Sequence, residues 1–219
     1  MKHFWAAHLK SAINIKFIEN RFYPFFRPKE YIRRKTYHLL KQASYIFTTP
    51  RLGFRTWQDN ELPSLLQMNQ DEQVMRYFPT IPDENDCRHF MQKMNSQFEE
   101  KGYCYWAVEL LESNEFIGFI GLSDQHYKAP FTPCIDIGWR LKKEFWGMGL
   151  APEGAEACFE YGKNQLGLKE IFAVAPKINE PSIRVMEKIG MINKGRFKHP
   201  TLMGFPMLRD CVYYLKSLS

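Results

Sequence analysis

Hydrophobic and polar positions along the chain follow two periods, one typical of half-buried strands and one typical of amphipathic helices. The strand-like runs are 52–57, 103–111, 116–122, 134–141, 169–175, 191–197 and 207–215. Helical spacing covers 59–69, 86–99, 150–166 and 180–189. Segments 77–82 and 124–133 contain prolines and are expected to be loops. Strands and helices mixed in this order predict an α/β (α+β) fold, a twisted mixed sheet flanked by helices, rather than a bundle or a sandwich.

Local signals sharpen several of these elements. Asp59 is a typical residue to cap the first helix. The turn 112–115 joins two strand-like runs in a predicted hairpin. Gly138, inside the run 134–141, allows close approach of another backbone or of a ligand, although a simple bulge would need the same glycine.

The segment 144–151 comes directly after the strand-like run 134–141 and carries Gly147 and Gly149. Pro152 falls in the first turn of the helix that follows, where its missing N–H costs nothing. The first N–H groups of a helix have no internal partner, and the helix dipole adds partial positive charge, so phosphate can bind there without a lysine. A tight turn without a ligand would use the same two glycines. Since no third glycine and no Gly-Lys-Ser/Thr follows, the loop does not resemble those that bind NAD or ATP.

A second segment, 179–191, reads as a short capped helix. Asn179 is its predicted cap, and Gly190 is its predicted end. Apolar residues recur on one face at helical spacing, namely Ile183, Met186 and Ile189. Asn179 and Ser182 lie three positions apart at the helix start, so both side chains can project to the same side.

Together the two segments resemble the GNAT superfamily of acetyl-CoA-dependent N-acetyltransferases, and within it the RimJ/RimL type of ribosomal-protein N-terminal acetyltransferase. The phosphate loop of the family reads Gln/Arg-x-x-Gly-x-Gly/Ala, and Gly147 and Gly149 fill its glycine positions. Glu144 stands where Gln or Arg is usual. The resemblance extends over about residues 49 to 217 and implies a single GNAT-type domain over 49–219, preceded by an extension over 1–48.

The later family signature is Asn-x-x-Ser, a hydrophobic helix and a Lys-x-Gly-Phe end. Asn179, Ser182, Lys188 and Gly190 match this signature, and Met191 replaces the Phe. The resemblance implies that acetyl-CoA contacts the strand end, the glycine loop and this helix start: Trp139, Arg140, Leu141, Trp146, Gly147, Met148, Gly149, Leu150, Ala151, Asn179 and Ser182. Pantetheine would pair with the backbone of the strand that ends at 139–141, where one N–H would polarise the thioester oxygen. No metal is expected.

The proton-transfer groups are less clearly marked in the sequence. Many family members carry a Tyr seven residues after the Asn to protonate the leaving thiolate, but Met186 occupies that position. Ser182 is the nearest alternative donor, although capping of the helix explains it equally well. Asp136 is the candidate general base, and it alternates on one strand face with Cys134 and Gly138. A carboxylate there would serve equally to bind the positive charge of the acceptor or to pair with a basic neighbour.

Three further residues are weaker candidates for the site. Asp124 and His126 lie in the predicted loop before Asp136, where an isolated histidine is usually only solvated. Glu153 matches a common family residue, but the helix dipole already favours a carboxylate in the first turn.

The net charge of +6 is unevenly distributed. Residues 1–48 carry ten Lys or Arg and two acidic residues, a charge of +8, whereas the remainder carries twenty and twenty-two, a charge of −2. This basic, aromatic extension contains an amphipathic pattern at Trp5, Leu9, Ile13 and Phe17. It would dock on RNA, on the ribosome or on an anionic membrane surface, or else pack on its own domain or form a loosely ordered leader outside the functional unit.

Composition narrows the setting in which the protein acts. The five cysteines are scattered and form no Cys-x-x-Cys pair, which argues against a disulfide framework and a zinc site and suits a reducing cytoplasm. No apolar stretch approaches the ~18–20 residues that a transmembrane helix needs. Lys10 interrupts the short N-terminal apolar run, unlike the core of a signal peptide.

The resemblance predicts transfer of an acetyl group from acetyl-CoA to a primary amine by direct attack in a ternary complex. The acceptor would be a protein N-terminus or a small amine, and a homodimer is one of the assemblies left open. The alternative is a non-catalytic module that binds acyl-CoA or docks on the ribosome, since the missing Tyr and the basic extension are compatible with both functions.

Overall fold

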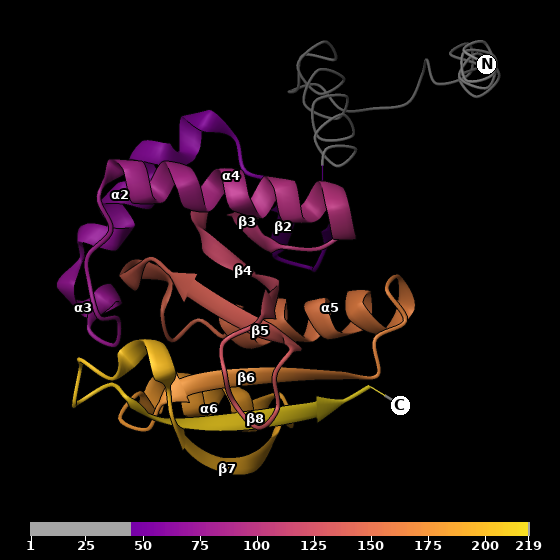
Figure 1. Cartoon of the computed structure of the whole chain (residues 1–219). Helices are drawn as coiled ribbons and strands as arrows, with labels where there is room; N and C mark the ends of the chain where they lie inside the picture. The colour runs from indigo at the N-terminus through magenta and orange to yellow at the C-terminus, as the bar shows by residue number, and fades with distance from the viewer. Residues whose placement is uncertain (1–44, 219) are drawn as a thin grey trace, which may run out of the picture. The chain divides into compact units, whose positions relative to one another are not determined.

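The computed structural model describes residues 45–218 (Figure 1). Its strands are β1 (Phe47–Thr48), β2 (Leu52–Arg55), β3 (Tyr105–Leu110), β4 (Phe116–Gln125), β5 (Cys134–Leu141), β6 (Glu170–Pro176), β7 (Ile192–Lys198) and β8 (Asp210–Ser217). Its α-helices are α2 (Leu62–Gln70), α3 (Glu72–Met75), α4 (Glu84–Lys101), α5 (Leu150–Asn164) and α6 (Glu180–Lys188). The 3-10 helices are η1 (Asp59–Glu61), η2 (Lys143–Phe145) and η3 (Pro200–Leu202). Among these described helices, none is long and apolar enough to cross a membrane.

The strands form one mixed sheet in the order β1-β2-β3-β4-β5-β6-β8-β7. A mixed sheet is what the sequence predicts. Neighbouring strands run antiparallel except β5 and β6, which run parallel. β4 and β5 are paired along eight residues each, whereas β5 and β6 pair only at Asp136 and Phe172. The sheet therefore parts in its middle, on the carboxyl side of Asp136.

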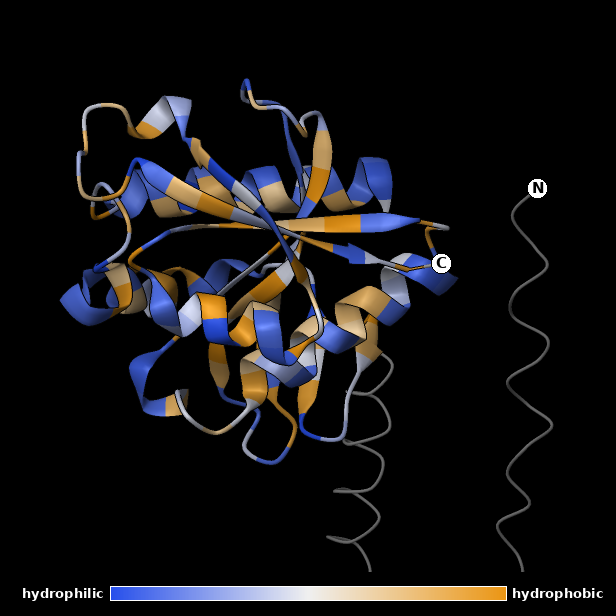
Figure 2. Cartoon of the chain, turned by 90° about the horizontal axis from the view of Figure 1, so that it is seen from below, coloured by the Kyte–Doolittle hydropathy of each residue, from blue (hydrophilic) through white to orange (hydrophobic). Residues whose placement is uncertain are grey.

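Helices cover both faces of the sheet. On one face, Asn95 of α4 exchanges two hydrogen bonds of 2.9 Å with the backbone of Trp57, and the indole of Trp57 donates to the carbonyl of Tyr105. On the other face, α5 lies so close that a Cβ on Gly154 would come within 2.4 Å of Ile120. Figure 2 shows hydrophobic stretches concentrated on the central strands and on the sides of the helices that meet them.

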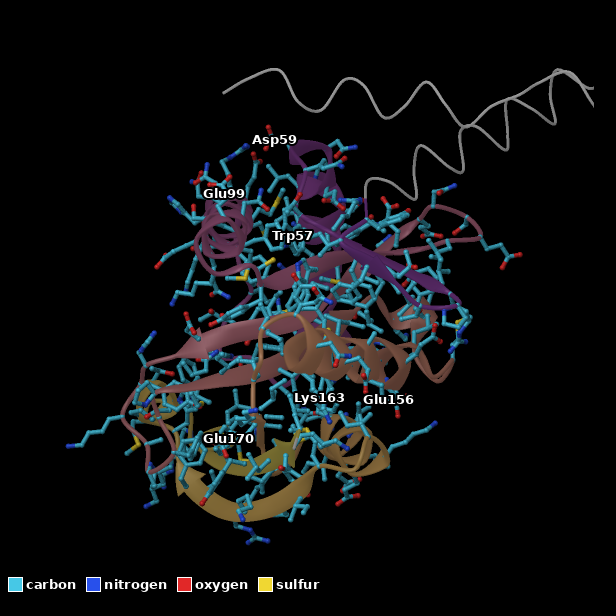
Figure 3. The ribbon with its side chains drawn as sticks, turned by 90° about the vertical axis from the view of Figure 1, so that its right-hand side faces the viewer. Trp57, Asp59, Glu99, Glu156, Lys163 and Glu170 are labelled. Carbon is cyan, nitrogen blue, oxygen red and sulfur yellow. The ribbon has the colours of Figure 1, made fainter. Side chains whose placement is uncertain are left out.

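The start of the first predicted helix differs from the prediction. Asp59 is not its cap: η1 begins there, Gln58 is the N-cap, and the Gln58 N–H donates to the Glu61 carboxylate at 2.8 Å. Glu61 can do this because Arg55 fixes its other oxygen at 2.6 Å. Figure 3 shows Asp59 at the outer edge of the molecule and Trp57 further inside, where it is buried with 4% exposure.

The sequence did not predict the short helix α3, and it predicted a shorter strand β4. Asp71 caps the short helix α3 by accepting hydrogen bonds from the backbone N–H groups of Gln73 and Val74. β4 continues to Gln125, beyond the predicted end at 122. Most of the extension predicted over 1–48, including its amphipathic pattern, lies outside the described residues. Phe47 and Thr48, at its end, form β1 and pair with β2.

Candidate active site

A cavity of about 550 Å³ opens beside the carboxyl end of β5. The glycine loop, the start of α5, the start of α6 and the chain around α3 form its walls. Ten of the eleven residues expected to contact acetyl-CoA line this cavity, and Met148 is the exception. The two segments that carry the family resemblance therefore meet in one place, although Ala151 and Asn179 are 28 positions apart.

The glycine loop holds a conformation that favours glycine. Gly147 and Gly149 have φ angles of +75° and +76°, in the left-handed region. A Cβ on Gly147 would meet no protein atom within 4 Å, because that position faces open space. Gly149 is the N-cap of α5 and has no side chain to satisfy the first N–H groups of the helix. These N–H groups, at the positive end of the helix dipole, are available for an anion.

A set of hydrogen bonds that the sequence analysis missed, here called the brace, holds this loop; it is formed by Thr49, Arg51 and Glu153. Arg51 donates through Nε to the Glu153 carboxylate at 2.6 Å and through Nη1 to the carbonyl of Met148 at 2.9 Å. Thr49 donates to the same carboxylate at 2.5 Å. Partial burial raises the pKa of Glu153, but these hydrogen bonds outweigh it and hold the pKa below its usual value. Glu153 therefore does more than complement the helix dipole: it ties the loop to the start of β2.

The start of α6 presents polar groups to the cavity. The Asn179 side chain caps the helix by accepting from the Ser182 N–H at 3.2 Å, as predicted. Both side chains line the cavity. Met186, at the position of the tyrosine found in many family members, is buried with 2% exposure and offers no proton.

Asp136 lies on β5 outside the lining of this cavity, so the structure does not bring it together with Ser182. Tyr105 donates a hydrogen bond of 2.6 Å to its carboxylate, and Gln125 donates to the Tyr105 oxygen at 3.3 Å. Burial raises the pKa of Asp136 to about 6, against the lowering effect of these hydrogen bonds. The partner of Asp136 is thus a phenol, not the basic neighbour considered from the sequence. The Tyr105 ring also fills the space beside Gly138, where a Cβ would lie 2.9 Å from it.

Asp124 is occupied elsewhere. It forms an ion pair with Lys101 and accepts a hydrogen bond of 2.7 Å from Tyr103. Burial alone would raise the pKa of Asp124. The two partners lower this pKa by a larger amount, so that it lies below its usual value. This environment suits a structural carboxylate on β4. His126, beyond the end of β4, is exposed and does not line the cavity.

Every charged side chain that lines the cavity is basic: Arg76, Arg140, Arg184 and Lys188. Among the described residues, no Asp or Glu belongs to the lining. Arg140 was expected to contribute only its backbone, yet its side chain also reaches the cavity and stacks on Phe78, with 3.8 Å between the guanidinium carbon and the ring centroid. One usable signal in the sequence was the alternation along β5, which places the even-numbered Asp136 and Arg140 on the same face.

Comparison with known proteins agrees with this geometry. Residues 51–192 match the acetyltransferase (GNAT) domain family. The uncharacterized N-acetyltransferase YnaD of Bacillus subtilis is 33% identical over 152 residues, which are 69% of this chain and 85% of YnaD. A GNAT-family acetyltransferase from Bacillus anthracis has a crystal structure that superposes with a TM-score of 0.65 at 30% identity, covering 78% of this chain and 97% of that one.

The fold is shared more widely. The ribosomal L7/L12 α-N-protein acetyltransferase RimL, crystallised with coenzyme A, superposes with a TM-score of 0.64 at 16% identity, covering 78% of this chain and 97% of that one. At that identity the similarity concerns the fold alone. The family match and the closer relatives confirm the resemblance seen in the sequence: this chain belongs to the GNAT family and is an N-acetyltransferase that uses acetyl-CoA.

Proposed function

We propose that acetyl-CoA binds in the cavity with its diphosphate on the N–H groups of 147–151 and its thioester near Ser182. The observation that carries this proposal is the meeting of the glycine loop and the start of α6 in one cavity. Pantetheine then follows the backbone of 139–141 where β5 has parted from β6. A backbone N–H at this strand end would polarise the thioester oxygen and stabilise the oxyanion that forms on attack.

The transfer proceeds by direct attack of a neutral amine on the thioester carbonyl. The C–N bond forms, the tetrahedral oxyanion collapses, and the C–S bond breaks to release the thiolate of coenzyme A. Ser182 is the proposed donor to that thiolate. Tyr77, which also lines the cavity, supplies a second hydroxyl that the sequence did not single out. Placement of the two reactants contributes several kcal/mol to the lowering of the barrier.

Asp136 is the proposed general base, acting through a water because it stands outside the cavity lining. Its pKa of about 6 suits this role, since the carboxylate is ionised at neutral pH and still basic enough to accept a proton. The hydrogen bond from Tyr105 would orient the carboxylate.

The acceptor is a primary amine of a protein N-terminus or of a small molecule. A polycation such as a polyamine or an aminoglycoside fits poorly, because the charged lining is entirely basic. RimL, a protein of the same fold, acetylates the N-terminus of a ribosomal protein, which supports a peptide acceptor. The extension over 1–48 would assist docking on RNA, the ribosome or an anionic surface, and a reducing cytoplasm suits the five free cysteines.

The test is thiol release on mixing the protein with acetyl-CoA and single amines. We expect release with short peptides or small neutral or acidic amines, and little with polyamines or aminoglycosides. Binding of acetyl-CoA without acceptor-dependent thiol release from any amine would favour the non-catalytic module instead.

A further inference from the structure

Arg140 is an arginine on the central strand whose charge has no counterpart. Its Nη1 donates to the side-chain oxygen of Asn69 on α2 at 2.7 Å. Its guanidinium lies against Phe78, and at 5.3 Å from the centroid of Phe119. Its Nε is shielded from solvent and has no hydrogen-bond partner. Among residues 45–218, no carboxylate forms an ion pair with it.

Such an arrangement is costly for the free protein. A cation withdrawn from water loses hydration, and one neutral amide does not replace an opposite charge. Burial accordingly lowers the pKa of Arg140 to about 10, although an arginine at that value stays charged at neutral pH. The contrast with Arg55 is direct: Arg55 is buried, with 5% exposure, and pairs with both Glu61 and Glu109. Arg140 is therefore equipped to receive an anion from outside the protein.

The side of the sheet identifies which ligand carries that anion. Arg140 pairs in register with Phe119 and contacts Asn69 of α2, so its side chain is on the face covered by α2 and α4. The diphosphate is proposed to lie at the start of α5, and α5 packs on the opposite face, against Ile120. The neighbour of Arg140 in the cavity wall is Phe78, in the loop 77–82 that joins α3 to α4, the helix that covers the same face. The anion thus belongs to the acceptor and not to coenzyme A.

We propose that Arg140 binds a carboxylate of the acceptor, so that the substrates are primary amines that also carry a carboxylate. This inference rests on the proposed function, since it names the acceptor class of the same site. A carboxylate approaches a guanidinium edge-on in its plane and forms paired, charge-assisted hydrogen bonds. Phe78 packs on the flat face of the guanidinium, so the ring orients the fork without competing for its edge. Asn69 accepts one hydrogen bond from Nη1, and the shielded Nε is out of reach, so the Nη1–Nη2 edge of the guanidinium is left for the ligand.

The chemistry fits two sources, a free amino acid-like molecule or a peptide with an acidic residue near its N-terminus. The experiment uses full-length protein and matched pairs of acceptors. One pair is a peptide amide that begins Ala-Asp and its Ala-Asn twin. The other is a free α-amino acid and its carboxamide. We measure kcat/KM for each twin by thiol release, and acetyl-CoA affinity by calorimetry.

We expect the wild-type protein to prefer the acidic twin of at least one pair by about 10- to 100-fold, the range of a charge-assisted pair. Arg140→Met should bring this ratio close to one, while Arg140→Lys, which keeps charge but loses the fork, should give an intermediate ratio. Acetyl-CoA affinity should change much less than the acceptor ratio, because the coenzyme is proposed to contact position 140 through its backbone. The pair that shows the preference identifies the source of the carboxylate.

Equal kcat/KM values for both twins of both pairs in the wild-type protein would overturn the inference while leaving the acetyltransferase proposal standing. A ratio that survives in Arg140→Met would also overturn it. Should Arg140→Met fail to fold, the wild-type ratios still decide, together with inhibition by an acid that lacks the amine. That inhibition should be competitive with the acceptor, and its absence counts against the inference. Failure to acetylate any amine, despite binding of acetyl-CoA, would instead sink the proposed function.

Discussion

The two sides of the cavity are built in different ways. The side proposed for the coenzyme consists of the glycine loop with the free N–H groups at the start of α5, and of Asn179 and Ser182 at the start of α6, each in its own short motif. The acceptor side consists of side chains that come from separate places in the chain, such as Asn69, Phe78 and Arg140. Backbone geometry depends on neighbouring residues, whereas the contact between Asn69 and Arg140 spans 71 positions. The proposed coenzyme contacts are therefore local in the sequence, whereas the proposed acceptor contacts are brought together by the fold.

The largest effect is expected on the coenzyme side, from Gly147→Val. A β-branched residue at a φ of +75° is strained, and its side chain would fill the open space proposed for the diphosphate. Acetyl-CoA affinity should fall by at least about 100-fold in calorimetry, since several anion-binding N–H groups are lost together. Gly167→Val is the matched control: Gly167 has a φ of +66°, also faces open space and does not line the cavity. Equal losses in both variants would show that strain alone is responsible.

Asp136→Asn tests the acceptor side. Removing a general base should lower kcat by about 100-fold or more. In the wild-type protein, kcat/KM should rise with pH through about 6 and then level off, because the base acts when ionised. In Asp136→Asn this rising limb should disappear.

The effect of Asp136→Asn on stability helps to decide whether Asp136 is a general base or a structural group. The native pKa of Asp136 is raised above its ordinary value of 3.8, so the native state binds more protons between about pH 4 and pH 6. Wild-type stability is therefore lost as pH rises through this window. Asp136→Asn should increase the free energy of unfolding at pH 7 by on the order of 2 kcal/mol. A gain in stability with unchanged kinetics would reduce Asp136 to a structural group.

Ser182→Ala is expected to have a smaller effect, because water can replace a hydroxyl that donates to a thiolate. We expect kcat to fall by about 10-fold with little change in acetyl-CoA affinity. Tyr77→Phe is the companion variant, since both hydroxyl-bearing residues line the cavity. If only Tyr77→Phe slows turnover, the proton donor is Tyr77 and the role of Ser182 is confined to the helix start.

The smallest effect is expected at the brace of the glycine loop. Arg51→Met removes the hydrogen bonds to Glu153 and to the Met148 carbonyl, and the loop must then be ordered by the ligand. Acetyl-CoA affinity should fall by about 3- to 10-fold, in keeping with a partly exposed ion pair. Arg88→Met, which breaks the exposed Arg88–Glu84 pair on α4, is the control and should leave affinity unchanged. A loss as large as that of Gly147→Val would make Arg51 a direct phosphate ligand.

Local patterns were sufficient for much of the fold. The strand 134–141, the start of α5 at Leu150 and the Asn179 cap of α6 are where the sequence predicts them, because alternation, proline and capping act over a few residues. The wrong cap at Asp59 has a cause that is partly distant, since the helix start depends on Glu61, which binds Arg55, and Arg55 in turn binds Glu109, 54 positions away.

The same distinction explains the candidate site. Glycine spacing predicts the loop, but not Arg51, whose partner Glu153 is 102 positions away. Asp136 could be chosen from its strand position, whereas its contact with Tyr105 requires the pairing of β3, β4 and β5. Both Asp124 and Asp136 accept a hydrogen bond from a tyrosine, and no pattern in the sequence indicates that Asp124 also pairs with Lys101.

The single register pair between β5 and β6 has a mechanical consequence. The pair of neighbouring strands with the fewest register partners is thus inside the sheet, with five strands on one side of the division and three on the other. A coenzyme bound there, as proposed, would form backbone hydrogen bonds that β6 does not form with β5. Binding of the coenzyme is then coupled to the stability of the contact between the two halves of the sheet. The enzyme with bound coenzyme should therefore resist heat and proteolysis better than the free enzyme.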